Sequence, residues 1–149
     1  MTATIRKARE KDWPALKRLL LQAKLPLADL SGDQLQQFLV AEDRQAMPPT
    51  IDGLIGLQTF GHDGLLRSLV VHAGQRGSGI GRRLVMALEE NASAAGVAEI
   101  WLLTIDAEVF FWKLGYRIAD RGEAPETIRA TAEFANLCPE SAHLMHKTL

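Results

Sequence analysis

The segment RGSGIGRR, residues 76–83, combines three glycines with three arginines in eight positions. Gly77, Gly79 and Gly81 lack the side chains that would keep a ligand away from the backbone amides. The flanking arginines can add charge-assisted hydrogen bonds to phosphate oxygens. The segment therefore predicts a place where an anion rests against the main chain.

Two regular elements flank this segment and would position it. Leu65 to His72 (LLRSLVVH) is rich in leucine and β-branched residues and lies between glycines, which predicts a well-buried strand. From Gly79 onward the sequence predicts an amphipathic helix, because apolar residues recur at helical spacing at Ile80, Leu84, Val85, Leu88 and Ala92. A helix that begins here directs its unpaired amides and partial positive charge at the glycine turn. Strand, turn and helix together indicate an anion site.

Two well-known phosphate loops do not fit this spacing. The mononucleotide-binding loop has lysine and then serine or threonine after its last glycine, whereas Gly81 is followed by Arg82 and Arg83. The dinucleotide fingerprint is G-x-G-x-x-G, and the spacing here is G-x-G-x-G. A glycine turn that only lets a helix pack on a sheet is the alternative that the residues leave open.

The pattern R-x-x-G-x-G, formed by Arg76, Gly79 and Gly81 after the strand, resembles the pyrophosphate-binding motif of the GNAT superfamily of acyl-CoA-dependent N-acetyltransferases. Downstream, AEIWLLT (residues 98–104) is similar to the next strand of that family. The segment AEVFFWKLGYR (residues 107–117) is similar to its short helix and Leu-Gly turn. The resemblance implies one α/β (α+β) domain over residues 1–149, with a mixed, mostly antiparallel sheet, a splayed parallel strand pair and flanking helices.

The resemblance also implies acetyl-CoA as co-substrate. Its pantetheine arm would lie between the splayed strands, here Arg67 to Val71 and Ile100 to Thr104, and its pyrophosphate would contact the amides of residues 76–82. A backbone N–H of Leu69 or Val70 would bind the oxyanion. The cofactor-binding residues expected on this basis are Leu69, Val70, Val71, Arg76, Gly77, Ser78, Gly79, Ile80, Gly81 and Arg82.

The sequence departs from the family at the position of its usual general acid. Many relatives have a tyrosine before the Leu-Gly turn that can protonate the leaving thiolate, and the matching residue here is Phe111. Tyr116 lies past the turn and is expected to be a packed strand residue, while Phe110 is expected in the core. Glu42, at the end of FLVAED, is the generic candidate for a base, with a solvated strand-end carboxylate as the alternative.

Candidate substrate residues carry unusual charges. Arg67 lies inside an apolar strand, and a buried arginine must be ion-paired or bound to a substrate anion. Ser68 would point to the opposite face by strand alternation. Arg129 and Glu133 are four apart on an expected helix, where they could pair with each other or face the acceptor.

The phrases LLRSLVV, FFWKLG and IRATAEF resemble the small N-acetyltransferases associated with arsenic-resistance loci in bacteria. This narrower resemblance implies an acceptor amine on a small, amino-acid-like toxicant. Such a molecule would carry acidic groups for Arg67 and Arg129. Nothing in spacing or composition indicates arsenic chemistry itself, since the single cysteine, Cys138, cannot form a site of several thiolates.

The composition limits the number of domains, the partners and the metal sites that the sequence supports. The 149 residues, 47% hydrophobic and 23% charged, suit one globular domain, and a net charge of −1 gives no support to a nucleic-acid partner. A single cysteine and the lack of an apolar leader or spanning run favour the cytoplasm and no membrane partner. His62, His72, His143 and His146 show no metal-ligand spacing, so no metal is expected.

The rest of the chain predicts an α/β order. Strands are expected at Thr4–Ala8, Phe38–Glu42, Leu54–Phe60 and Ala142–Lys147. Helices are expected after an Asp12 N-cap, at Gly32–Gln37 and at Glu126–Ala135.

Three functions follow as alternatives: a small-molecule N-acetyltransferase, which is favoured, a protein or peptide N-acetyltransferase, and a non-catalytic acyl-CoA-binding sensor. A homodimer is conceivable for each, since relatives often pair through their terminal strands.

Overall fold

The computed structural model describes residues 3–25, 32–75, 77–132, 134 and 141–149. Within these ranges the strands are β1 (Thr4–Lys7), β2 (Phe38–Asp43), β3 (Thr50–Phe60), β4 (Asp63–Val71), β5 (Glu99–Thr104), β6 (Arg117–Ala119) and β7 (His143–Thr148). The α-helices are α1 (Trp13–Gln22), α2 (Ile80–Ala94), α3 (Glu108–Lys113) and α4 (Glu126–Arg129). Short 3-10 turns are η1 (Glu10–Asp12), η2 (Gly32–Gln37), η3 (Ala73–Gln75) and η4 (Arg121–Glu123).

The strands form a seven-stranded sheet in the order β1-β2-β3-β4-β5-β7-β6. The pairs β1–β2, β2–β3, β5–β7 and β6–β7 are antiparallel, whereas β4 and β5 run parallel, in register from Asp63↔Glu99 to Leu65↔Trp101. This confirms the predicted mixed, mostly antiparallel sheet with one parallel pair. The splay of that pair stays a prediction.

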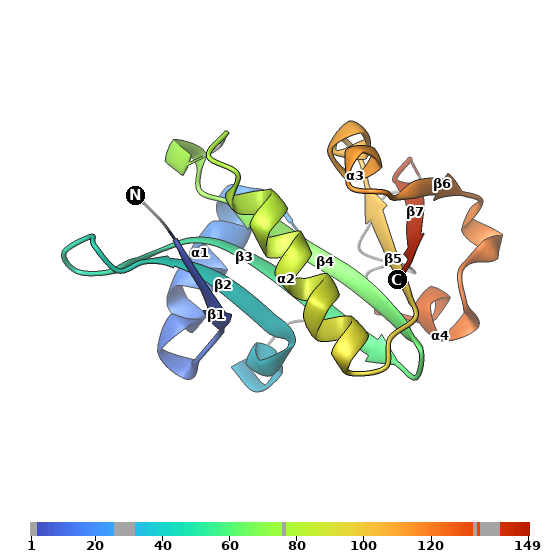
Figure 1. The fold of residues 1–149 in the computed structure, drawn as a ribbon, viewed down its shortest axis with the longest axis horizontal. Coiled ribbons are helices and arrows are strands. Elements are labelled where there is room, and N and C mark those ends of the chain that lie inside the picture. The colour runs from blue at the N-terminus through green and yellow to red at the C-terminus, as the bar shows by residue number, and fades with distance from the viewer. Residues whose placement is uncertain (1–2, 26–31, 76, 133, 135–140) are drawn as a thin grey trace. The chain divides into compact units, whose positions relative to one another are not determined.

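The chain divides into two compact units, here called unit 1 (residues 1–57 and 68–90) and unit 2 (residues 58–67 and 91–149). In unit 1, α1 and α2 lie on opposite faces of the strands (Figure 1). A Cβ added at Gly53 would meet Leu84 and Ile80 of α2. The neighbouring Leu54 packs instead with Leu16, Leu19 and Leu20 of α1 in one buried cluster. This alternation fixes which face of β3 each helix covers.

Unit 2 has its own core on β4, β5 and β7. Leu65, Trp101 and Leu144 pack there with Ala124, Ile128 and Phe134, which come from the segment around α4. The indole of Trp101 stacks on His146 with ring centroids 4.8 Å apart, and His146 Nδ1 lies 2.9 Å from Glu99 Oε2. A polar cluster therefore joins β5 to β7 beside the apolar core.

Several expected elements shift. β3 begins at Thr50, four residues before the expected Leu54, because the hairpin ladder continues to Asp43↔Thr50. β6 was not expected, since three residues with an exposed Ile118 give no periodic signal. The predicted continuous helix Glu126–Ala135 is wrong, since α4 ends at Arg129 and Ala130 forms its C-cap. Residues 133 and 135 of that prediction lie outside the described residues. Asp12 precedes α1 but makes no side-chain cap hydrogen bond, because Arg6 and the Arg9 amide occupy its carboxylate.

Candidate functional site

The glycine turn after β4 leaves open space beside its backbone. Gly77 and Gly79 have φ of +86° and +85°, and a Cβ added at either would meet no heavy atom within 4 Å. The positive φ angles explain why glycine occupies both positions. The space beside the two residues is free to receive a ligand. This open cradle beside the backbone therefore suits an anion such as a pyrophosphate.

Helix α2 begins immediately after the cradle. The Arg83 amide donates to the Gly79 carbonyl at 3.1 Å, which closes the first helical turn. The amides of Gly79, Ile80, Gly81 and Arg82 thus come before the first intrahelical bond and remain for a ligand. The Ile80 side chain is buried, so its contribution to such a site is its amide alone. Arg76, the first residue of the motif, lies outside the described residues.

The two arginines in the first turn of α2 differ in what they contact. Arg83 Nη2 donates to the Ala3 carbonyl at 2.7 Å, which ties α2 to the segment before β1. Arg82 is exposed. Arg83 is exposed as well, but its contact with Ala3 leaves Arg82 as the better candidate for a phosphate contact, which stays a prediction.

β4 carries the expected thioester-binding residues and an unusual backbone angle. Ser68 has φ of +60° inside the strand, in the left-handed region that serine rarely adopts. Strand alternation assumes extended backbone, so this angle removes the basis for expecting the Arg67 and Ser68 side chains on opposite faces, and that expectation stays a prediction. Both side chains are buried, Arg67 to 2% exposure. Val70 is buried, and Leu69 and Val71 are half-buried.

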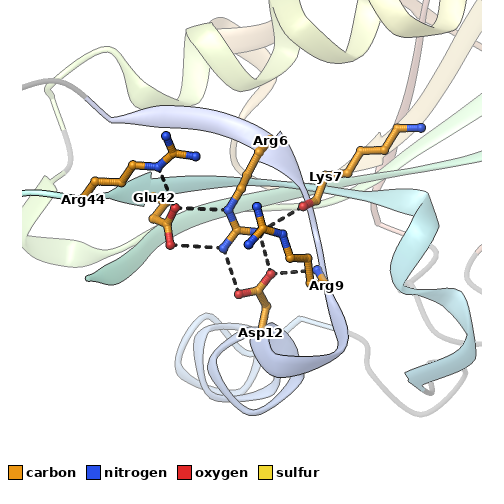
Figure 2. A network of polar contacts seen from close by, with 6 residues as sticks. All are labelled: Arg6, Lys7, Arg9, Asp12, Glu42 and Arg44. Carbon is orange, nitrogen blue, oxygen red and sulfur yellow. Dashed lines mark hydrogen bonds and ion pairs between the residues drawn. The ribbon is translucent and has the colours of Figure 1, made fainter. Parts of the chain in front are cut away.

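Glu42 belongs to an ionic network on β1, β2 and η1, shown in Figure 2. Arg6 contacts both oxygens of Asp12, at 2.8 and 3.0 Å, and both oxygens of Glu42, at 3.1 and 3.2 Å. Arg44 adds a third contact to Glu42 at 3.1 Å. The hydrogen bonds from Arg6 and then Arg44 lower the pKa of Glu42 to about 2.

The pKa values of Arg6 and Asp12 shift as well, that of Arg6 upward and that of Asp12 downward. Hydrogen bonds to Asp12 and Glu42 raise the pKa of Arg6. Burial raises the pKa of Asp12, but its hydrogen bonds to Arg6 and the Arg9 amide outweigh burial, so the net shift is downward. A carboxylate as weakly basic as Glu42 is poorly matched to accepting a proton from an amine near neutral pH. This geometry gives Glu42 a structural contact and no feature of a general base.

A cavity of about 860 Å³ lies within unit 1 beside this network. Its walls include Asp12, Arg18 and Leu19 from η1 and α1, and Ile51 and Asp52 from β3. His72 and Gln75, which lead into the glycine turn, complete the lining. Sequence reasoning missed Asp52, which is 7% exposed, because a polar residue near a strand end gives no sign of burial.

In unit 2, the aromatic residues around α3 are arranged differently from expectation. Phe111 is buried at 4% exposure, whereas Phe110, expected in the core, is only half-buried. Tyr116 is fully buried, as expected, but it lies just before β6 and not in a strand. Its ring packs edge-on against Phe111 with centroids 5.5 Å apart. Arg129 is exposed on α4, and Glu133 lies outside the described residues.

Two further features of the described residues concern metal binding and membrane spanning. They contain no group of three or more His, Cys, Asp or Glu side chains that could hold a metal ion. None of the helices in the described ranges is long and apolar enough to cross a membrane.

The sequence profile of the acetyltransferase (GNAT) domain family matches residues 34–118, more than half of the chain. The chain belongs to the GNAT acetyltransferase family. Comparison with curated protein sequences gives no match.

Solved structures share the GNAT fold over the whole chain. N-acetylglutamate synthase from Neisseria gonorrhoeae, complexed with coenzyme A and N-acetyl-glutamate, is 22% identical with a TM-score of 0.84 over 100% of this chain. This chain covers only 35% of that synthase. Rv2747 from Mycobacterium tuberculosis, in complex with CoA, is 23% identical with a TM-score of 0.83, covering 98% of this chain and 99% of that one. PaiA N-acetyltransferase from Thermoplasma acidophilum, in complex with coenzyme A, is 18% identical with a TM-score of 0.73, covering 100% of both chains.

Proposed function

We propose that this GNAT enzyme transfers acetyl from acetyl-CoA to the primary amine of a small, amino-acid-like molecule. The observation that carries the proposal is the open glycine cradle before α2, in a chain whose sequence matches the GNAT acetyltransferase domain. The buried guanidinium of Arg67 lies on β4, the strand expected to hold the thioester, and is the proposed contact for an acceptor carboxylate. The gonococcal synthase, whose structure contains N-acetyl-glutamate, supports an acceptor of this class.

Different segments of the chain would bind different parts of acetyl-CoA. The amides of residues 77 and 79–82, with Arg76 and Arg82, would bind the pyrophosphate at the start of α2. The Ser78 amide donates to the Gln75 carbonyl at 3.3 Å. Leu69, Val70 and Val71 would bind the pantetheine arm, and an amide of Leu69 or Val70 would stabilise the oxyanion formed when a neutral amine attacks the thioester carbonyl. The bond from carbon to sulfur then breaks and coenzyme A leaves as thiolate. Holding the two reactants together supplies much of the rate.

Arg67 and Arg129 would bind the acidic groups of the acceptor. Glu133 would contact its ammonium before the amine loses its proton. The narrower resemblance adds one acceptor to consider, an organoarsenical analogue of glutamate. We further propose that residues 1–149 act as one catalytic domain in the cytoplasm.

The deciding experiment measures free thiol release from acetyl-CoA against a panel of amines, with acetyl-CoA affinity measured in parallel. The panel contains neutral, basic and acidic amino acids, glutamate-analogue toxicants and short peptides. Turnover confined to small acidic amines, with KM raised at least tenfold in Arg67→Gln and kcat less affected, supports the proposal. Preference for peptides, or tight acetyl-CoA binding without turnover of any amine, overturns it.

A further inference from the structure

The cavity in unit 1 contains a buried carboxylate oxygen without a partner. The Asp52 side chain is 7% exposed, and its Oδ2 has no hydrogen-bond partner among the described residues. Its Oδ1 accepts one hydrogen bond, from the Thr50 hydroxyl at 3.1 Å. A buried acceptor left unsatisfied costs about 1–3 kcal/mol, and more when it is charged. Such a group in the wall of a cavity indicates a ligand that would satisfy it.

Asp52 lines the cavity at an irregularity of the β2–β3 hairpin. Ala41 pairs with Gly53 and Glu42 pairs with Ile51, so the register passes over Asp52. Ile51 packs with the α1 cluster and also lines the cavity. The lining includes residues of η1 and α1, so Asp52 shares this cavity with them.

The other carboxylates in the described lining already have cationic partners. Asp12 and Glu42 share Arg6, and Glu42 also contacts Arg44. Asp52 is the lining carboxylate whose second oxygen is left for a positively charged group. A ligand ammonium is a donor of the right charge for that oxygen.

The wall formed by η1 and α1 has the opposite charge. Lys11, Ala15 and Arg18 all line the cavity. Lys11 comes four residues before Ala15 and Arg18 comes three residues after it, so the three lie on one side of the helical segment. Leu19 and Ile51 add apolar surface. The volume of about 860 Å³ is ample for an amino-acid-sized ligand.

We propose that this cavity is a binding site for a small zwitterion, a free amino acid with an apolar side chain. Its ammonium contacts Asp52, and its carboxylate contacts Arg18 and Lys11. The inference concerns binding within unit 1 and does not depend on acetyl transfer. Its test is therefore made without acetyl-CoA, and its failure is distinguishable from failure of the thiol-release assay.

The test uses three matched probes with the full chain: L-phenylalanine, 2-phenylethylamine, which lacks the carboxylate, and 3-phenylpropanoate, which lacks the ammonium. Calorimetry or amide chemical shifts give each affinity. L-phenylalanine is expected to bind at least tenfold more tightly than either fragment. Asp52→Asn should weaken L-phenylalanine and the amine at least tenfold and leave the carboxylate probe unchanged. Arg18→Gln should weaken L-phenylalanine and the carboxylate probe and leave the amine unchanged.

Asp43→Asn is the matched control, because Asp43 lies on the same hairpin and does not line the cavity. It should bind all three probes as the unmodified chain does. Arg18 is exposed, so its variant keeps the test decisive even if Asp52→Asn folds poorly. Equal affinities for the three probes, or variants that weaken all three alike, would overturn the proposal.

Discussion

Arg6 forms ion pairs with Asp12 and Glu42, and these pairs make the stability of the protein depend on pH. The pKa of Glu42 is about 2 in the folded chain and near its ordinary value of 4.5 when unfolded. Glu42 therefore contributes stability that is fully present above about pH 4.5 and is lost as the pH falls toward 2. Glu42→Gln should lower the free energy of unfolding by about 1–3 kcal/mol at pH 7. Urea unfolding should show that this difference disappears near pH 2.

The neighbouring Asp43 provides the control for that experiment. Its Oδ1 accepts a hydrogen bond from the Gln45 amide in the hairpin turn, a role that asparagine can keep. Asp43→Asn should leave the difference between pH 7 and pH 2 as in the unmodified chain. Because Glu42 stays ionised above pH 5, Glu42→Gln should also leave the shape of the kcat profile from pH 6 to 9 unchanged. If the fall in kcat toward lower pH disappeared in Glu42→Gln, this would show that Glu42 accepts a proton in catalysis.

Asp52 is the opposite case, a buried carboxylate that lacks a charged partner among the described residues. Asp52→Asn keeps an acceptor for the Thr50 hydroxyl and removes the charge, so it should raise the free energy of unfolding by about 1 kcal/mol. Chemical denaturation at pH 7 measures this. A loss of stability comparable to that of Glu42→Gln would mean that the Asp52 charge is compensated within the fold.

Phe111 stands where many GNAT enzymes have their general acid, yet it is buried against Tyr116 and Phe110. A hydroxyl added here must leave water, so Phe111→Tyr should lower the free energy of unfolding by about 1–2 kcal/mol. The rate of thiol release should change by less than about threefold, because the ring at this position packs against Phe110 and Tyr116. Thermal unfolding and steady-state kinetics check the two parts. Complete loss of activity would instead place Phe111 against the substrate.

At the scale of elements, the two ends of α2 offer a matched pair of glycines. Gly79 before the helix and Gly96 after it both have strongly positive φ, +85° and +91°, and open space around an added Cβ. Alanine should cost about 1–2 kcal/mol of stability at either position. Only the Gly79 variant should also lose acetyl-CoA affinity, by at least tenfold, and Gly79→Glu should abolish binding by adding negative charge. Equal affinities for the alanine variants at 79 and 96 would contradict the pyrophosphate assignment.

The elements also show what local sequence can and cannot predict. The β4–turn–α2 unit could be predicted because glycine conformation and helical periodicity are properties of neighbouring residues. The Arg6–Asp12–Glu42 network could not, because Arg6 and Glu42 are 36 residues apart and meet only through the β1–β2 register. The same holds for Asp52, because the cavity that it lines is formed by segments far apart in the sequence. Helix α4 was predicted too long because its apolar spacing continues past Arg129, although the backbone turns at Ala130.

For the whole molecule, binding of acetyl-CoA should appear as added stability. A ligand that binds only the folded state at 100 times its Kd stabilises by about 2.7 kcal/mol. For a chain of 149 residues this corresponds to a rise in Tm of about 5–10 °C, measured by thermal unfolding over a range of acetyl-CoA concentrations. Coenzyme A without the acetyl group should give most of the shift if the pyrophosphate contacts dominate affinity. Gly79→Glu should give none, whereas Gly96→Ala should show the full shift from a lower starting Tm. A shift that persists in Gly79→Glu would mean that the nucleotide binds elsewhere on the molecule, away from the glycine turn.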